Sequence, residues 1–266
     1  MIQEFSKGSK NIIFDIGANE GNDGLSLALL FKDCQIYAFE PNRDLVKVIN
    51  FNKKRIEKII GSQIKNYKLI NKAISNKNTT LNFNISKNIG AHSLYNFNKN
   101  LYQFKRHQKY YEVTKKIKVR VIKLSSFLKN KKFKRIKYLH CDAQGSDINV
   151  LKSLENFIKY LDCGVVEVSA NKKRDLYSKS LNNLSNLKKF LKKKKFNIID
   201  IKSNDPYRNE LNINFKNSAI NHYNFLNLKE KILLRFYQKF IRKIIIGHYK
   251  IFLYKFLYRI LNATNK

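Results

Sequence analysis

The sequence predicts an α/β protein built on a mostly parallel, twisted sheet with helices on both faces, followed by a basic amphipathic helical tail. Three observations lead to this prediction. Short apolar segments typical of buried strands alternate with longer helical patterns over residues 10–216. Two of these segments end in a polar turn that carries a carboxylate and opens a helix. From Leu228 onward, apolar and aromatic residues recur beside Lys and Arg. We expect a domain at residues 1–220 and a tail at residues 221–266.

The first polar turn lies in residues 11–24, with the sequence NIIFDIGANEGNDG. An apolar run is followed by Asp15 and by glycines that include Gly17 and Gly21, and a helix is predicted at residues 25–32. Strand, glycine-rich turn and helix together let a backbone approach a ligand closely. Because the turn carries acidic residues and no lysine, it suits a ligand with an ammonium and a sulfonium better than a phosphate. An ordinary βα turn with glycines for packing is the alternative.

The second strand is predicted at residues 35–42 and reaches its tip at Glu40. An acidic residue about 20 residues beyond such glycines can accept hydrogen bonds from both hydroxyls of a ribose. A solvated carboxylate at the end of a strand is the alternative. Pro41 ends the strand, and residues 43–60 are predicted to form a basic amphipathic helix.

The second polar turn follows a strand that ends at Asp142. Ser146 and Asp147 then open a helix, with Ser146 as its predicted N-cap. Ligands of open α/β sheets bind at the carboxyl ends of the strands, so we expect Asp142, and Glu167 near the tip of a later strand, to lie at the site. A lysine-rich helix is predicted at residues 181–194. Other strands are predicted at residues 67–75 with the loop that follows, 79–86, 116–124 (half-exposed or at an edge), 163–169, 196–203 and 211–216.

The composition indicates which partners the protein attracts and in which compartment it is expected. A formal net charge of +35 implies attraction to polyanions, although lysines spread over the whole chain also suit a biased coding sequence. Cys34, Cys141 and Cys163 lack disulfide or metal-site spacing, so we expect small buried hydrophobes in a reducing compartment. No apolar run reaches the ~18 residues of a spanning helix. We expect a cytoplasmic protein, or one peripheral on the inner face of a membrane.

Several motifs together resemble the FkbM-type methyltransferase family over residues 10–216. They are FDIGANEGN, YAFEPN, the AIS loop, HSL, HCDAQGSDINVLKSL and VVEVS, in the family's order and spacing. The chain departs from the family pattern at His140, where Lys is common, and at Ser146, where Ala is frequent. The resemblance implies a Rossmann-like class I methyltransferase fold, S-adenosylmethionine as cofactor, and O-methylation of a hydroxyl, often on sugars or secondary metabolites.

The resemblance also assigns roles to residues. Asp142 is the first candidate for the active-site carboxylate, as base or as anchor for substrate or cofactor. His140 and His92 are the next candidates for the base, and a structural or surface role is the alternative for each. His140 would point to the same face of its strand as Asp142. No metal constellation is evident, and we predict no metal site. The residues expected to bind the cofactor are Asp15, Gly17, Ala18, Asn19, Gly21, Glu40, Pro41, Ala73 and Asp142.

The tail and the charge leave alternatives open. Between Leu228 and Leu261 the only acid is Glu230, and a helix broken near Gly247 is predicted. Its apolar face would lie on an anionic membrane surface, or pack on the domain or on a second subunit. We expect a small-molecule or glycan acceptor and no specific nucleic acid; the oligomeric state stays open. An RNA methyltransferase, suggested by the Lys–aromatic stretch at residues 102–111, and an inactive polyanion- or membrane-binding module are the alternative functions.

Overall fold

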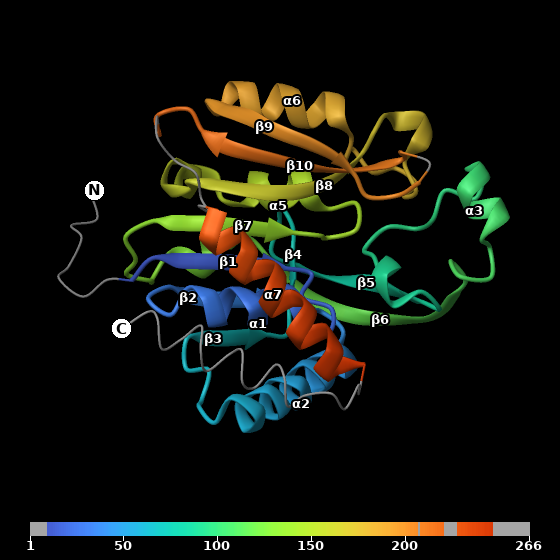
Figure 1. The fold of residues 1–266 in the computed structure, drawn as a ribbon. Helices are drawn as coiled ribbons and strands as arrows, with labels where there is room; N and C mark the ends of the chain where they lie inside the picture. The colour runs from blue at the N-terminus through green and yellow to red at the C-terminus, as the bar shows by residue number, and fades with distance from the viewer. Residues whose placement is uncertain (1–9, 207, 221–227, 247–266) are drawn as a thin grey trace.

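The computed structural model describes residues 10–206, 208–220 and 228–246 (Figure 1). Within these residues, seven strands form the main sheet in the order β3-β2-β1-β7-β8-β10-β9. Neighbouring strands are parallel, except that β10 runs antiparallel to β8 and β9. The strands are β1 (Ile12–Ile16), β2 (Gln35–Phe39), β3 (Tyr67–Ile70), β7 (Ile136–Cys141), β8 (Cys163–Ser169), β9 (Phe196–Ser203) and β10 (Glu210–Asn217).

Helices cover both faces of this sheet and bury two separate apolar clusters. One face is covered by α1 (Asn22–Leu30), α2 (Arg43–Ile60) and α7 (Leu228–Ile245). The other is covered by α4 (Leu124–Leu128), α5 (Asp147–Ser153) and α6 (Leu184–Lys193). The predicted α/β class with helices on both faces is therefore confirmed. The strand order reverses direction between β1 and β7, and the crevice at such a switch point is where open α/β sheets bind ligands.

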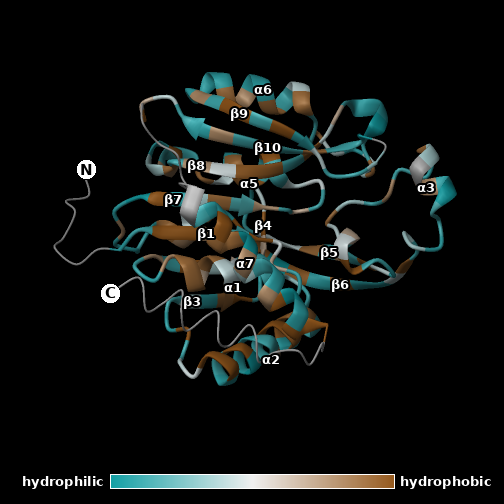
Figure 2. Ribbon diagram, viewed as in Figure 1, coloured by the Kyte–Doolittle hydropathy of each residue, from teal (hydrophilic) through white to brown (hydrophobic). Residues whose placement is uncertain are grey.

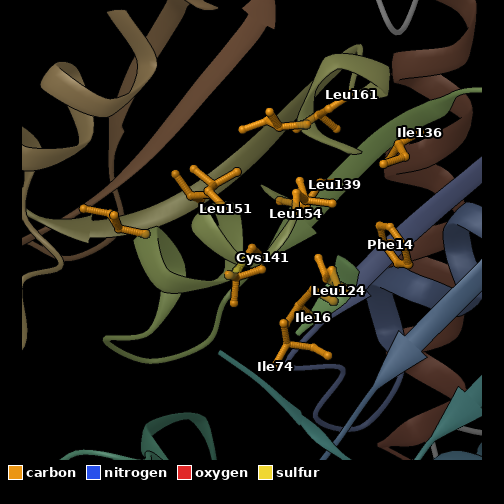
Figure 3. Packing of buried hydrophobic residues seen from close by; sticks show 14 of the residues in the cluster. Phe14, Ile16, Ile74, Leu124, Ile136, Leu139, Cys141, Leu151, Leu154 and Leu161 are labelled. Atoms are coloured by element: carbon orange, nitrogen blue, oxygen red, sulfur yellow. The ribbon is translucent and has the colours of Figure 1, made fainter. Parts of the chain in front are cut away.

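Strand β1 is buried along its whole length, as its apolar sequence predicts. Successive side chains alternate between the two faces, so Phe14 and Ile16 join one cluster and Ile13 joins the other. Figure 3 shows Phe14 and Ile16 on the same side of the sheet as Leu139 and Leu151. In Figure 2, β1 is mostly hydrophobic, whereas α2 and α6 alternate between hydrophobic and hydrophilic residues. All three cysteines are buried and free, which confirms their predicted role as small hydrophobes.

A second sheet adjoins the carboxyl end of the main one. Its order is β4-β6-β5, with β4 at Ala73–Ile74, β5 at Thr79–Ser86 and β6 at Val113–Ile122. Strand β6 therefore lies in the middle and is no edge strand; its alternating exposed and buried residues confirm the half-exposed alternative. The predicted third strand ends at Ile70, because Asn71 turns the chain and donates to the carbonyls of Glu40 and Pro41 (both 2.9 Å). The short elements are η1 (Ile89–Ala91), α3 (Tyr102–Arg106), η2 (Glu155–Tyr160) and η3 (Lys172–Arg174).

The sequence correctly places Ser146 at the N-cap of α5, but the expected hydrogen bond from its side chain is absent. Ser146 occupies the N-cap position, but its hydroxyl lies 3.3 Å from that of Ser75 and makes no capping hydrogen bond. The Oδ1 atom of Asn182 accepts from the Ile148 N–H (3.0 Å) in its place. A residue 36 positions beyond the serine thus satisfies the start of the helix.

Helix α7 packs its apolar face on the domain (Figure 1). Gln238 Nε2 donates to Asp23 Oδ1 of α1 (2.8 Å). Among the described helices, none is both long and apolar enough to cross a membrane. The rest of the predicted tail, residues 221–227 and 247–266, lies outside the described residues. The buried side chains of α7 are Leu233, Tyr237, Phe240, Ile241 and Ile244.

Candidate functional site

A pocket opens at the carboxyl ends of β1, β2 and β7, beneath the second sheet. Both predicted turns contribute to it. The first does so through Ile16, Gly17 and Asn19, and the second through Asp142, Ala143, Gln144 and Ser146. Of the predicted site residues, those that line it are Gly17, Asn19, Glu40, Pro41, Ala73, His92 and Asp142. Asp15, Ala18, Gly21 and His140 do not line this pocket, although they adjoin residues that do. The second sheet and η1 close the pocket from above with Ile74, Phe83, Ile89 and Leu94.

The turn after β1 requires glycine at position 17. Gly17 has a φ of +83°, and an added Cβ would lie 2.0 Å from the carbonyl oxygen of Asp142. The two polar turns therefore touch through their backbones. The N–H groups of Gly17 and Ala18 both donate to the Phe39 carbonyl (3.0 Å each), which fixes the turn against the tip of β2. Gly21, at a φ of +87°, then opens α1.

Two backbone hydrogen bonds fix the carboxylate of Glu40 at the mouth of the turn. Asn19 N–H donates to Oε2 (2.9 Å) and Asn42 N–H donates to Oε1 (2.8 Å). Glu40 is 4% exposed, and this burial raises its pKa to about 7 although both hydrogen bonds lower it. Each carboxylate oxygen keeps a second lone pair. The Oδ1 atom of Asn19 is buried in the same pocket and has no hydrogen-bond partner within the described part of the chain.

Asp15 and His140 form a pair on the α1 side of the sheet. They stand opposite each other in the β1–β7 register, and Asp15 Oδ1 lies 3.0 Å from His140 Nδ1. Gly24 makes room for Asp15, since a Cβ there would lie 2.3 Å from Oδ2. Burial lowers the pKa of His140, but the hydrogen bond with Asp15 and the nearby carboxylates, Asp23 among them, raise it overall to about 9. The pair therefore holds a proton at neutral pH and supports the pocket from behind.

A hydrogen-bonded bridge fixes Asp142. Gln144, which has a φ of +47°, donates from Nε2 to Oδ1 of Asp142 and to Oε1 of Glu167 (3.2 Å). The hydroxyl of Tyr177 donates to Oε1 of Gln144, and Asn204 donates to Oε2 of Glu167. The second turn and Glu167 were expected at the site. Tyr177 and Asn204 were not, because each comes from a loop that has no recognisable motif.

His92 lines the pocket as a buried, neutral ring. Its Nδ1 accepts from the Ser86 N–H (3.2 Å), and burial lowers its pKa. A nitrogen that accepts carries no proton, so the proton of the neutral ring lies on Nε2. In this arrangement His92 presents a donor rather than a base. Its predicted role as a base is untested and stays a prediction.

A protein-family model matches more than half of the chain. The Methyltransferase FkbM domain matches residues 15–198. The chain belongs to this family.

Solved structures with a similar fold include one protein named as a methyltransferase and one bound to a cofactor product. Methyltransferase FkbM from Methylobacillus flagellatus is 15% identical, with a TM-score of 0.45 over 80% of this chain and 45% of that chain. TrmK from M. capricolum, in complex with S-adenosyl-homocysteine, is 12% identical, with a TM-score of 0.43 over 96% of this chain and 88% of that chain. The present chain thus spans less than half of the first of these. No curated protein sequence matches it.

Members of the FkbM family use S-adenosylmethionine, and the pocket residues fit this cofactor. When bound, it supplies an electrophilic methyl group on a sulfonium. The Glu40 carboxylate suits the two ribose hydroxyls, and the unpartnered Asn19 Oδ1 suits the ammonium group. Ala73 and Pro41 supply apolar walls for the adenine ring of the cofactor. These contacts are predictions for this FkbM domain.

Behind Asp142 the FkbM domain opens a second, polar groove on the α7 side of the sheet. Asp142 lines the groove as well as the pocket, and His140 lines the groove beside it, on the face that the strand pattern predicted. The other lining side chains are mostly amides and charged groups from α1, α7, β8, β9, β10 and the turn after β9. Among them are Glu167, Lys202, Asn204, Asn212, Asn214 and Gln238.

Several buried acidic side chains lie close enough to Asp142 for their charges to interact with it. Burial is the largest cause of their raised pKa values, and repulsion from Asp142 adds to it. The pKa of Asp147 is raised to about 7 and that of Glu210 to about 8. Burial also raises the pKa of Asp142 itself, against the hydrogen bond from Gln144. A carboxylate with a raised pKa accepts a proton more readily than one with an ordinary pKa.

Proposed function

We propose that this FkbM methyltransferase transfers the methyl group to a hydroxyl oxygen of a sugar or glycan. The observation that carries the proposal is the position of Asp142, which lines both the cofactor pocket and the polar groove. An acceptor hydroxyl in the groove would meet the methyl carbon at this carboxylate. The groove's amide and charged side chains offer the donors and acceptors that a polyhydroxylated ring requires.

The proposed reaction needs one base. As the acceptor oxygen forms its bond to the methyl carbon, the bond from carbon to sulfur breaks and the sulfonium becomes a neutral thioether. The hydroxyl proton passes to Asp142, which the Gln144 amide holds in place. Positioning by Gln144 and Tyr177 aligns the carboxylate before the acceptor arrives.

Two measurements on three variants test the proposal. Calorimetric titration with S-adenosylhomocysteine should show tenfold or weaker binding in Glu40→Ala, because the diol loses both of its acceptors. Asp142→Asn should retain that binding but lose about 10²–10⁴-fold in methyl transfer to a panel of glycans and sugar phosphates. Asp33→Asn is the matched control, since Asp33 is exposed before β2 and lines neither the pocket nor the groove. Full activity of Asp142→Asn would refute the role of Asp142.

RNA is the second candidate acceptor, supported by the net charge of +35. The same assay should include total RNA at low and high salt. Methylation of RNA with no turnover of any sugar would replace the glycan proposal. A folded protein that binds no S-adenosylhomocysteine would leave the inactive binding module as the remaining function.

A further inference from the structure

Helix α7 has an outer face that the packing on α1 leaves free. Its buried residues, Leu233, Tyr237, Phe240, Ile241 and Ile244, all face the domain. The apolar face that the sequence offered to a membrane is therefore occupied. The question becomes what the opposite face of the helix does.

The exposed residues of α7 and its last turn form one continuous stripe. At 100° per residue, which follows from 3.6 residues per turn, they all fall within an arc of about 120°. The described part of this stripe includes no acidic residue. Its exposed members are Lys231, Ile232, Arg235, Lys239, Arg242, Lys243 and Ile246.

Two large aliphatic side chains lie on either side of four of the five cations of the stripe. Ile232 is 61% exposed and Ile246 is 58% exposed. They are separated by about 21 Å along the axis, at 1.5 Å per residue. Cations between two exposed apolar anchors match the interface of an anionic bilayer, where phosphates meet the acyl region. An RNA backbone would complement the cations equally well, but it offers the isoleucines nothing apolar.

From this arrangement we infer that the outer stripe of α7 docks the domain on an anionic lipid surface. The helix lies parallel to the bilayer, with its cations on the headgroup phosphates and its two isoleucines in the acyl boundary. The inner face stays packed on α1, so docking requires no unfolding of the helix. The inference does not depend on which acceptor is methylated.

Co-sedimentation of the full chain with vesicles tests the inference. Vesicles of phosphatidylcholine alone should bind little protein, and vesicles that also contain phosphatidylglycerol should bind it strongly. Each Lys or Arg near such a surface contributes a factor of about five to the partition coefficient. The double variant Arg235→Gln with Lys239→Gln should therefore bind about 25-fold more weakly. Ile232→Gln with Ile246→Gln should weaken binding about tenfold, because two exposed aliphatic groups no longer enter the acyl region.

The matched control lies on the other side of the sheet. Lys192 and Lys193 are exposed on α6, so Lys192→Gln with Lys193→Gln removes the same charge from the opposite face. This variant should bind like the unchanged protein. If the α6 variant and the Arg235→Gln, Lys239→Gln variant weakened binding equally, net charge alone would drive binding and the inference would be overturned. Unchanged binding of the isoleucine variant, with RNA displacing the protein from vesicles, would identify a general polyanion surface and would overturn it as well.

Discussion

Two glycines that both have a positive φ allow the energetic cost of disturbing the contact between the two polar turns to be measured. Gly17 has a φ of +83° and Gly61, at the C-cap of α2, has a φ of +72°. A Cβ at Gly61 would meet nothing within 4 Å, whereas a Cβ at Gly17 would meet the Asp142 carbonyl oxygen at 2.0 Å. Alanine at either position bears the strain of a positive φ, but of these two positions only Gly17 would bring its Cβ into collision with the end of another strand.

The expected difference follows from the contacts around Gly17. Positive φ costs an alanine about 1–2 kcal/mol in both variants. Real Cβ atoms do not approach closer than 3.0 Å, so Gly17 and Asp142 must separate by about 1 Å. This movement strains the hydrogen bond from Asp142 N–H to the Ile16 carbonyl (3.0 Å). Losing one or two such bonds costs about 1–3 kcal/mol, and the crowding itself costs about 1–3 kcal/mol. Gly17→Ala should therefore be about 2–6 kcal/mol less stable than Gly61→Ala.

Urea unfolding followed by far-UV circular dichroism measures the difference in free energy of unfolding. The same separation displaces Asp142 from the pocket, so Gly17→Ala should also bind S-adenosylhomocysteine more weakly, while Gly61→Ala should bind it normally. Equal stability of the two variants would refute the close approach and, with it, the geometry of the site.

Three further outcomes are expected. Phe240→Ala should lose about 3–5 kcal/mol of stability in urea, and Ile232→Ala on the exposed side of the same helix less than about 0.5 kcal/mol; similar losses would contradict the docking of α7. Tyr177→Phe should lose about 1 kcal/mol in the same assay, because one hydrogen bond to the bridging glutamine disappears, with cofactor affinity unchanged; weaker cofactor binding would place the tyrosine in the pocket. Groups with raised pKa values set the pH dependence, and Glu40, Asp147, Glu210 and His140 are among them. Since the folded chain holds more protons than the unfolded chain between about pH 5 and 8, the urea midpoint should fall as the pH rises, and a rising midpoint would contradict it.

The sheet and its turns could be predicted because their signals are local. Residues 43–60 and 79–86 form a helix and a strand with the predicted bounds. Amphipathic periodicity, together with Asn42 before the first segment and Gly61 after it, defines the helix within a single stretch of chain. The pocket could be predicted for the same reason, since Glu40 and Asp142 each end a strand that the sequence marks with an apolar run.

The supporting residues of the site could not be predicted from such signals. Asn182 caps α5, and Tyr177 holds the glutamine of the second turn, yet both lie in the loop after β8. Asparagine and tyrosine in a loop predict nothing by themselves, because their partners are 34 and 33 residues away in the chain, respectively. The same holds for the pairing of Asp15 with His140, which depends on the register between β1 and β7.

The surface on which the tail packs is indicated by another helix, α1. An amphipathic pattern such as that of α7 shows that one face will be covered, but it does not say by what. Helix α1 answers the question, because it has almost no polar side: every residue from Gly24 to Leu29 is buried. A helix that is apolar all round needs cover on its outer face as well as against the sheet. Since α1 lies at the surface of the main sheet, a second apolar face had to be found elsewhere in the chain, and α7 provides it. The isoleucines and cations left outside are then the part of the tail whose partner lies beyond the domain.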